Sequence, residues 1–256
     1  MTTQKLADLI PPLIFGLAVL ALWEAGVRIA GVPTIILPAP SAIALRFVVS
    51  VPTLAADSVQ TMRGILAGYV IGNVAGLFVA VMIDRSPFLQ RGLLPLGNLV
   101  SALPIVGVAP IMVMWFGFDW QSKAAVVVIM TFFPMMVNAA AGLVSAGAME
   151  RDLMKTYGAS YEQTLIKLRL PAALPFVFNA LKINTTLAMI GAIVAEFFGT
   201  PTVGMGFRIS TEVGHLSIDM VWATIVVAAI AGSAFYALVA GVEQRATFWH
   251  ASYRAR

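Results

Sequence analysis

Side chains that could carry out chemistry are few in this sequence and lie far apart. The 256 residues include 12 acidic residues, two histidines and no cysteine. The absence of cysteine excludes disulfides, thiolate metal sites and cysteine nucleophiles. His215 and His250 flank a long apolar stretch, so we do not expect them to bind one metal. Because no Gly-x4-Gly-Lys-Ser/Thr phosphate loop occurs either, we expect no metal, cofactor or ATPase site in this chain.

Glu196 is the acidic residue in the least expected place, because it lies near the end of an apolar stretch. A carboxylate there either contacts a solute or acts as a gate, or it binds a loop backbone or Arg208, and both hypotheses stay open. Other polar and sulfur-containing or aromatic side chains in apolar stretches are candidates for lining a solute pathway. They are Asn184, Thr185, Thr186, Met112 and Trp115. Threonine often bonds a carbonyl of its own helix, and methionine also fills protein cores, so packing is the alternative.

The segment 150–171 is too polar to cross a membrane and too long for a plain turn. Gly158 can adopt a positive φ and so end a short first helix. The sequence Ser160-Tyr-Glu-Gln has the spacing of a capping box, which predicts a second short helix up to Leu170. Pro171 should then break that helix. The result would be two short helices at an angle, which either lie on lipid headgroups or dock a soluble partner.

Composition places these residues in a membrane protein. Apolar residues make up 60% of the chain and charged residues 11%, against about 45–50% and about 25% in soluble domains. Helices are expected, because lipid offers no partner to the backbone groups of isolated strands. The expected spans lie near 9–26, 64–83, 95–117, 124–145, 180–198 and 220–242. Pro104 and Pro110 interrupt the third, where the helix either kinks or breaks. The expected fold is an all-α integral membrane protein with a single domain over 1–256.

Four glycines recur at every fourth position of the second expected span, and these are Gly64, Gly68, Gly72 and Gly76. They lie near one face of a helix, where a second helix can approach closely. This spacing favours packing within the chain, and a seam between two copies is the alternative. Asn73 lies in the same span and is expected to form a buried hydrogen bond rather than to contact a solute.

The basic residues predict how the chain is oriented. With six spans, both termini lie on one side, and most of the 16 lysines and arginines fall on that side. The loops concerned are 84–92 and 150–182. The positive-inside rule places both loops and both termini in the cytoplasm. Basic cytoplasmic loops also account for the net charge of +4, so the expected surroundings are a lipid bilayer and no nucleic acid is expected as a partner.

The segment 150–171 resembles the EAA loop in permease subunits of binding-protein-dependent ABC importers, whose pattern is Glu-Ala-Ala-x3-Gly-x9-Ile-x-Leu-Pro. Here the pattern reads Asp152-Leu-Met-x3-Gly158-x9-Leu168-x-Leu170-Pro171. The glycine, the spacing and the final Leu-Pro match, whereas the first three positions and the isoleucine position differ. Further segments resemble the nitrate, sulfonate and taurine branch of these permeases. They are Leu37-Pro-Ala-Pro-Ser41, Ala102-Leu-Pro-Ile-Val-Gly-Val-Ala-Pro110, Trp115-Phe-Gly117 and the stretch Ala195–Phe207.

The resemblance implies a type I importer fold in a bacterial inner membrane. It implies a dimer of permeases, most simply two copies of this chain, bound to two cytoplasmic ATPase subunits that hold ATP and Mg²⁺. An extracytoplasmic binding protein would deliver the solute, and the loop 150–171 would couple the permease to the ATPase. The docking residues implied by the motif are Asp152, Leu153, Met154, Tyr157, Gly158, Ala159, Ser160, Leu168, Leu170 and Pro171.

Two other classes of protein fit less well. A secondary transporter driven by an ion gradient would need midplane carboxylates or broken helices in inverted repeats, and Glu196 near a span end is the one candidate acid. An intramembrane enzyme would need a Ser-His or metal constellation, and Ser233 has no histidine within plausible reach. The solute stays open among sulfonates, taurine, nitrate and pyrimidine-like vitamin precursors, and the lack of a mid-span lysine or arginine favours a neutral or zwitterionic one.

Overall fold

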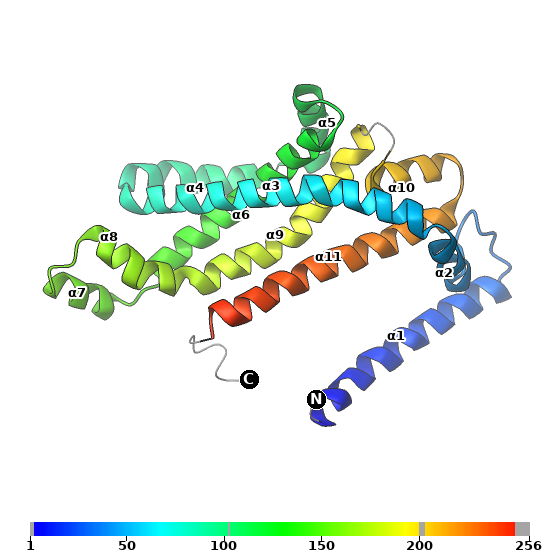
Figure 1. The fold of residues 1–256 in the computed structure, drawn as a ribbon, viewed down its shortest axis with the longest axis horizontal. Coiled ribbons are helices and arrows are strands. Elements are labelled where there is room, and N and C mark those ends of the chain that lie inside the picture. The colour runs from blue at the N-terminus through cyan, green and yellow to red at the C-terminus, as the bar shows by residue number, and fades with distance from the viewer. Residues whose placement is uncertain (1–2, 102, 200–202, 249–256) are drawn as a thin grey trace.

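The computed structural model describes residues 3–101, 103–199 and 203–248, which form helices joined by short connections (Figure 1). These ranges contain no β-strand, in agreement with the expected all-α class. Three parts of the sequence expectations lie outside the described residues. They are Ala102, residues 200–202 within the Ala195–Phe207 motif, and His250.

Five helical segments in the described part of the chain are long and apolar enough to cross a membrane. They are α1 (Thr3–Ile29), α3 (Val51–Arg85), α6 (Trp120–Val144), the run from α8 to α9 (Tyr161–Phe198) and α11 (Ile218–Ala246). They overlap the expected spans near 9–26, 64–83, 124–145, 180–198 and 220–242. The 35 residues of α3 correspond to a rod of about 50 Å, which is longer than the hydrocarbon layer.

The expected third span over 95–117 does not form one helix. The chain forms α4 (Pro87–Ser101) and then α5 (Ile105–Phe116), and Figure 1 shows α5 turned away from the direction of α4. Pro104 precedes α5 with an extended backbone, at φ −68° and ψ 115°. A proline has no N–H to continue the hydrogen bonds of α4, so the helix ends before it and a new helix starts after it.

The core forms where α3, α6 and α9 (Leu170–Phe198) pack together, and the glycines of α3 allow the close approach. A Cβ added to Gly68 would lie 2.4 Å from the carbonyl oxygen of Ala124 in α6. A Cβ at Gly76 would lie 2.5 Å from the carbonyl oxygen of Phe132. The glycine spacing therefore serves packing within the chain, as expected.

Helix α1 stands apart from this core (Figure 1). Only 6% of its apolar span is buried, and its ring contact with the bundle is Trp23 on Trp222, with ring centroids 4.9 Å apart. After the proline-rich stretch the chain forms α2 (Pro40–Val49), and Ser41 at its start donates its backbone N–H to Glu24 of α1 at 3.0 Å. The remaining helices are α7 (Ala148–Thr156) and α10 (Met205–Gly214), which belong to the sites described next.

Candidate functional sites

The first half of the EAA-like loop is α7 followed by a tight turn at Gly158, which has φ +69°. The N–H of Gly158 bonds the carbonyl of Lys155 at 2.9 Å, and the N–H of Ala159 bonds that of Met154 at 3.0 Å. These two bonds form a Schellman motif, which satisfies carbonyls at the end of α7. The positive φ expected at Gly158 and its role in ending a helix are both confirmed.

The second half of the loop begins with the expected capping box. The N–H of Gln163 bonds the Ser160 hydroxyl at 3.2 Å, and the Ser160 N–H bonds the Gln163 side-chain oxygen at 2.9 Å. This reciprocal pair satisfies two backbone donors at the start of α8 (Tyr161–Thr164). The turn between α7 and α8 is therefore fixed by local hydrogen bonds on both sides.

The expected break at Pro171 is wrong. The helix continues from α8 through η1, a π-helical turn over Leu165–Arg169, into α9 without interruption. Directly after η1, the N–H of Leu170 bonds the carbonyl of Leu165, five residues back. Pro171 lies in the first turn of α9, and the wide π-turn before it makes room for a residue that has no N–H to donate.

The tip of the loop is exposed and partly apolar. The exposed fraction of Leu153 is 54% and that of Tyr157 is 79%, and no residue of α7 is buried. Asp152 is also exposed, and its carboxylate pairs with Lys155 at 3.1 Å. The motif residues nearer the bundle, Leu168, Leu170 and Pro171, are half-buried. The loop thus presents the first residues of the motif on an accessible turn that local hydrogen bonds hold in place.

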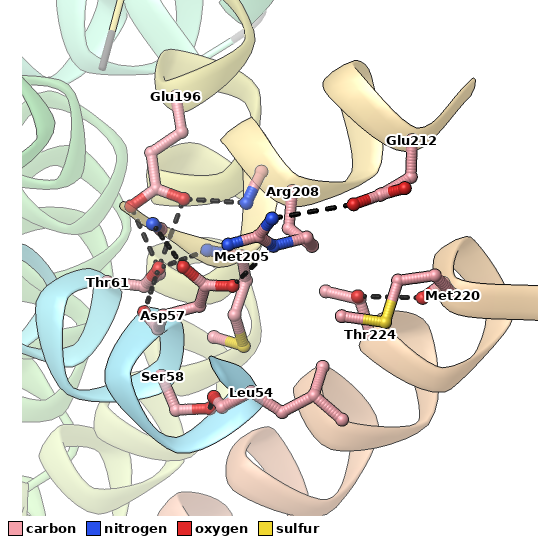
Figure 2. A network of polar contacts seen from close by, with 12 residues as sticks. Leu54, Asp57, Ser58, Thr61, Glu196, Met205, Arg208, Glu212, Met220 and Thr224 are labelled. Atoms are coloured by element: carbon pink, nitrogen blue, oxygen red, sulfur yellow. Dashed lines mark hydrogen bonds and ion pairs between the residues drawn. The ribbon is translucent and has the colours of Figure 1, made fainter. Parts of the chain in front are cut away.

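Glu196 lies in a second site, at the far end of α9 from the loop, and Figure 2 shows its contacts. Its side chain is buried and accepts hydrogen bonds from the Gly206 N–H at 2.7 Å and from the Thr61 hydroxyl at 2.8 Å. The Thr61 oxygen in turn accepts the N–H of Met205 at 2.9 Å. This geometry is that of a carboxylate binding a loop backbone, one of the two hypotheses for Glu196, and its role as a gate stays a prediction.

Asp57 of α3 completes this site, which we name the α10 cluster (Asp57, Thr61, Glu196 and Arg208). Asp57 is buried and accepts the Gly204 N–H at 2.9 Å and Arg208 Nε at 2.8 Å. Arg208 also pairs with Glu212, four residues further along α10, at 3.4 Å. The hydrogen bond to Asp57 raises the pKa of the Arg208 guanidinium further above its ordinary value. Two carboxylates thus occupy the N-terminus of α10, where backbone N–H groups favour negative charge.

The expected pathway residues are not brought together. Asn184 is buried and donates to Asn73 Oδ1 at 2.6 Å and to the carbonyl of Thr131 at 2.8 Å. The buried hydrogen bond expected of Asn73 is thereby confirmed. Thr185 is buried as well, and its hydroxyl bonds the carbonyl of Lys182 in its own helix at 2.7 Å.

Thr186, Met112 and Trp115 line two separate grooves. Thr186 lies with Ser233 and Tyr236 in a groove of about 510 Å³ between α9 and α11. Met112 and Trp115 lie in an almost wholly apolar groove of about 520 Å³ between α5 and α6. The described residues contain no group of three histidine, aspartate or glutamate side chains placed to hold a metal ion.

Several charged contacts were not predicted from the sequence. Asp84 meets Arg169 and Tyr161 at the base of the EAA-like loop, and Lys182 meets Glu243 at 2.6 Å between α9 and α11. The sequence does indicate that these charges need partners, because each lies at the edge of an apolar stretch, where an unpaired charge is unfavourable. It leaves the identity of each partner open.

Comparisons with known proteins agree with this arrangement. Residues 72–248 match the family described as binding-protein-dependent transport system inner membrane component. The chain is 30% identical to a probable ABC transporter permease protein of Haemophilus influenzae, over 88% of this chain and 91% of that protein. It is 30% identical to the formylaminopyrimidine transport permease protein ThiX of Halalkalibacterium halodurans, over 93% and 95%. It is 29% identical to the taurine transport system permease protein TauC of Escherichia coli, over 77% and 70%.

Such a system includes an ATPase and a solute-binding protein besides its membrane component. The helices long enough to cross a membrane fit that membrane component, and permease subunits of this kind have no ATPase activity of their own. The chain belongs to the family of inner membrane components of binding-protein-dependent transport systems, and it is the multi-pass permease subunit of an ABC importer.

Proposed function

We propose that two copies of this permease form the translocation pathway of the importer and that the loop 150–171 of each copy docks one cytoplasmic ATPase subunit. The ATPase subunits bind ATP and Mg²⁺, and the permease binds neither. The observation that carries this proposal is the exposed turn between α7 and α8, which local hydrogen bonds hold rigid while Leu153 and Tyr157 face outward. Apolar side chains on a rigid exposed turn are suited to fill a cleft on a partner protein.

The chain passes from Asp84 at the loop base to Asp119, which bonds Gln60 near the other end of α3, so α4 and α5 together supply a sixth crossing. With six crossings, we place both termini and this loop in the cytoplasm. The loop and its surroundings carry Arg151, Lys155, Lys167 and Arg169, and Arg85 lies at the nearby end of α3. This cluster of basic residues follows the positive-inside rule. The α10 cluster then lies toward the outer face, where a binding protein delivers solute.

The solute is a small polar molecule of the sulfonate, taurine, nitrate or pyrimidine-like class. Relatives named for taurine and formylaminopyrimidine transport support this range. The groove between α9 and α11 offers the side chains of Thr186, Ser233 and Tyr236 and no charged group. Uncharged hydroxyls among apolar side chains suit a neutral or zwitterionic solute better than an anion.

The test of the docking loop is Gly158→Val in the assembled importer. A β-branched residue is disfavoured at φ +69°, and no neighbouring atom lies within 4 Å of the added Cβ, so the substitution acts on the backbone of the turn. We expect ATPase co-purification to fall and uptake of radiolabelled taurine or formylaminopyrimidine, whichever the unaltered importer transports, to be lost.

The matched control is Gly158→Asn, because asparagine tolerates a positive φ and should leave docking and uptake near their original values. Full uptake and full ATPase binding by Gly158→Val would contradict the docking proposal. Purification of the unaltered chain without any nucleotide-binding partner would also contradict the docking proposal.

A further inference from the structure

A buried polar contact holds the base of the EAA-like loop. Arg169 Nη1 bonds Asp84 Oδ2 at 2.7 Å and Arg169 Nη2 bonds Asp84 Oδ1 at 2.5 Å, so the guanidinium and the carboxylate form a bidentate pair. The Tyr161 hydroxyl donates to Asp84 Oδ2 at 2.8 Å. The exposed fraction of the Asp84 side chain is only 6% and that of Arg169 is 15%, so water has little access to this contact.

These three residues connect four helical segments. Asp84 lies at the end of α3, Tyr161 begins α8 and Arg169 ends η1. Arg169 Nε also bonds the carbonyl of Leu143, near the end of α6, at 2.9 Å. The Arg85 guanidinium lies 5.6 Å from the centre of the Tyr161 ring, which adds a cation–π contact. The ends of α3 and α6 are therefore bonded directly to the chain segment that follows the loop tip.

The π-turn η1 is the local feature that places Arg169 at the end of this segment. A π-turn inserts one extra residue into a helix and changes which face the following side chains occupy. Arg169 is the last residue of η1, and α9 begins directly after it. Because α7 has no buried residue, the loop is attached to the bundle through this polar base and through the apolar packing of Leu165 against Leu143.

We infer that Asp84, Arg169 and Tyr161 are positioning residues that fix the angle of the coupling loop and transmit its movement to α3 and α6. The inference rests on the proposed docking of the loop to an ATPase. A bidentate pair fixes orientation as well as distance, so a shift of the loop must move the ends of α3 and α6 with it. At its other end α3 carries Asp57 and Thr61 of the α10 cluster, so the same helix connects both sites.

The test measures amide hydrogen exchange in the complete importer with and without Mg²⁺ and a non-hydrolysable ATP analogue. In the unaltered complex, the nucleotide should change exchange both in the loop, 148–160, and in α10. With Asp84→Asn, the ATPase should stay bound and the loop should still respond. The response of α10 should fall at least about fivefold, the lower end of typical coupling between sites. Asp84→Glu, which keeps the charge, should retain part of the α10 response.

The matched control is Glu243→Gln, which removes a carboxylate from an ion pair of similar burial between α9 and α11. It should keep the α10 response within about twofold, because that pair does not contact the loop. Equal responses in Asp84→Asn and the unaltered complex, or an equal loss in Glu243→Gln, would overturn the inference.

Tyr161→Phe covers the case in which Asp84→Asn does not fold. It removes one hydrogen bond and should lower the α10 response in the same direction but less, and an unchanged response would also overturn the inference. Failure of the docking proposal would give a different result. In that case the ATPase would leave residues 148–160 unprotected in the unaltered complex, and both proposals would be contradicted.

Discussion

At the scale of single residues, this chain pairs the buried charges described here instead of leaving them as free reactive groups. Glu196 and Asp57 accept backbone N–H groups at the start of α10, and Arg208 binds Asp57. Lys123 donates to the carbonyls of Phe118 and Gly199 and so joins the turn before α6 to the end of α9. Such charge-assisted bonds to backbone groups hold the loops at this end of the bundle in place.

Thr61 tests this interpretation, because its oxygen lies between Glu196 and the N–H of Met205. Thr61→Val keeps the shape and removes the hydroxyl, so a carboxylate and a backbone donor each lose a partner. We expect the unfolding free energy to fall by about 1–3 kcal/mol. The measurement is the thermal unfolding midpoint of the detergent-solubilised protein, followed by intrinsic fluorescence.

Thr224→Val is the matched control for this prediction. Thr224 is equally buried, but its hydroxyl bonds only the carbonyl of Met220 in its own helix, at 2.8 Å. That carbonyl keeps its helical hydrogen bond when the hydroxyl is removed, so the loss should be smaller. Equal shifts in the two variants would mean that Thr61 has no special role in the α10 cluster.

At the scale of elements, the sequence predicts features that depend on a few neighbouring residues. The Gly158 turn and the Ser160 capping box involve residues within five positions of each other, and both form as expected. The break expected at Pro171 does not form, because the π-turn before it lets the helix continue into α9 with the proline in its first turn. The partners Asp84 and Arg169 are 85 residues apart, and no spacing rule in one sequence identifies such a pair.

The glycines of α3 give a prediction for helix packing. In Gly68→Ala the new Cβ would approach the Ala124 carbonyl oxygen to 2.4 Å, and backbone atoms cannot move aside easily. We expect a loss of stability of about 1–3 kcal/mol from overpacking. Gly241→Ala in α11 is the control, because no atom lies within 4 Å of its added Cβ, and it should be neutral or stabilising by about 0.5–1 kcal/mol. Equal unfolding midpoints would contradict the packing role of the α3 glycines.

At the scale of the whole molecule, α3 and α9 both run between the two sites, and α3 holds each of them by an ion pair. The first part of α3 holds the α10 cluster through Asp57, and its last turn holds the loop base through Asp84. Composition and charge predicted a multi-pass helical protein and its orientation, because these depend on sums over many residues. They could not predict that α3 forms ion pairs at both sites, since that follows from long-range packing of α3 against α6 and α9.

The orientation predicts that these two sites lie on opposite sides of the membrane. The chain has no cysteine, so a single introduced cysteine is the only thiol in it that a membrane-impermeant maleimide can label. Labelling then reports on which side of the membrane that residue lies. Tyr157→Cys on the coupling loop and Val213→Cys at the end of α10 are suitable, because the two side chains are 79% and 48% exposed. In intact spheroplasts we expect Val213→Cys to be labelled and Tyr157→Cys to be labelled only after lysis. The reverse pattern would place the loop outside, where no cytoplasmic ATPase could reach it, and would contradict the docking and coupling proposals together.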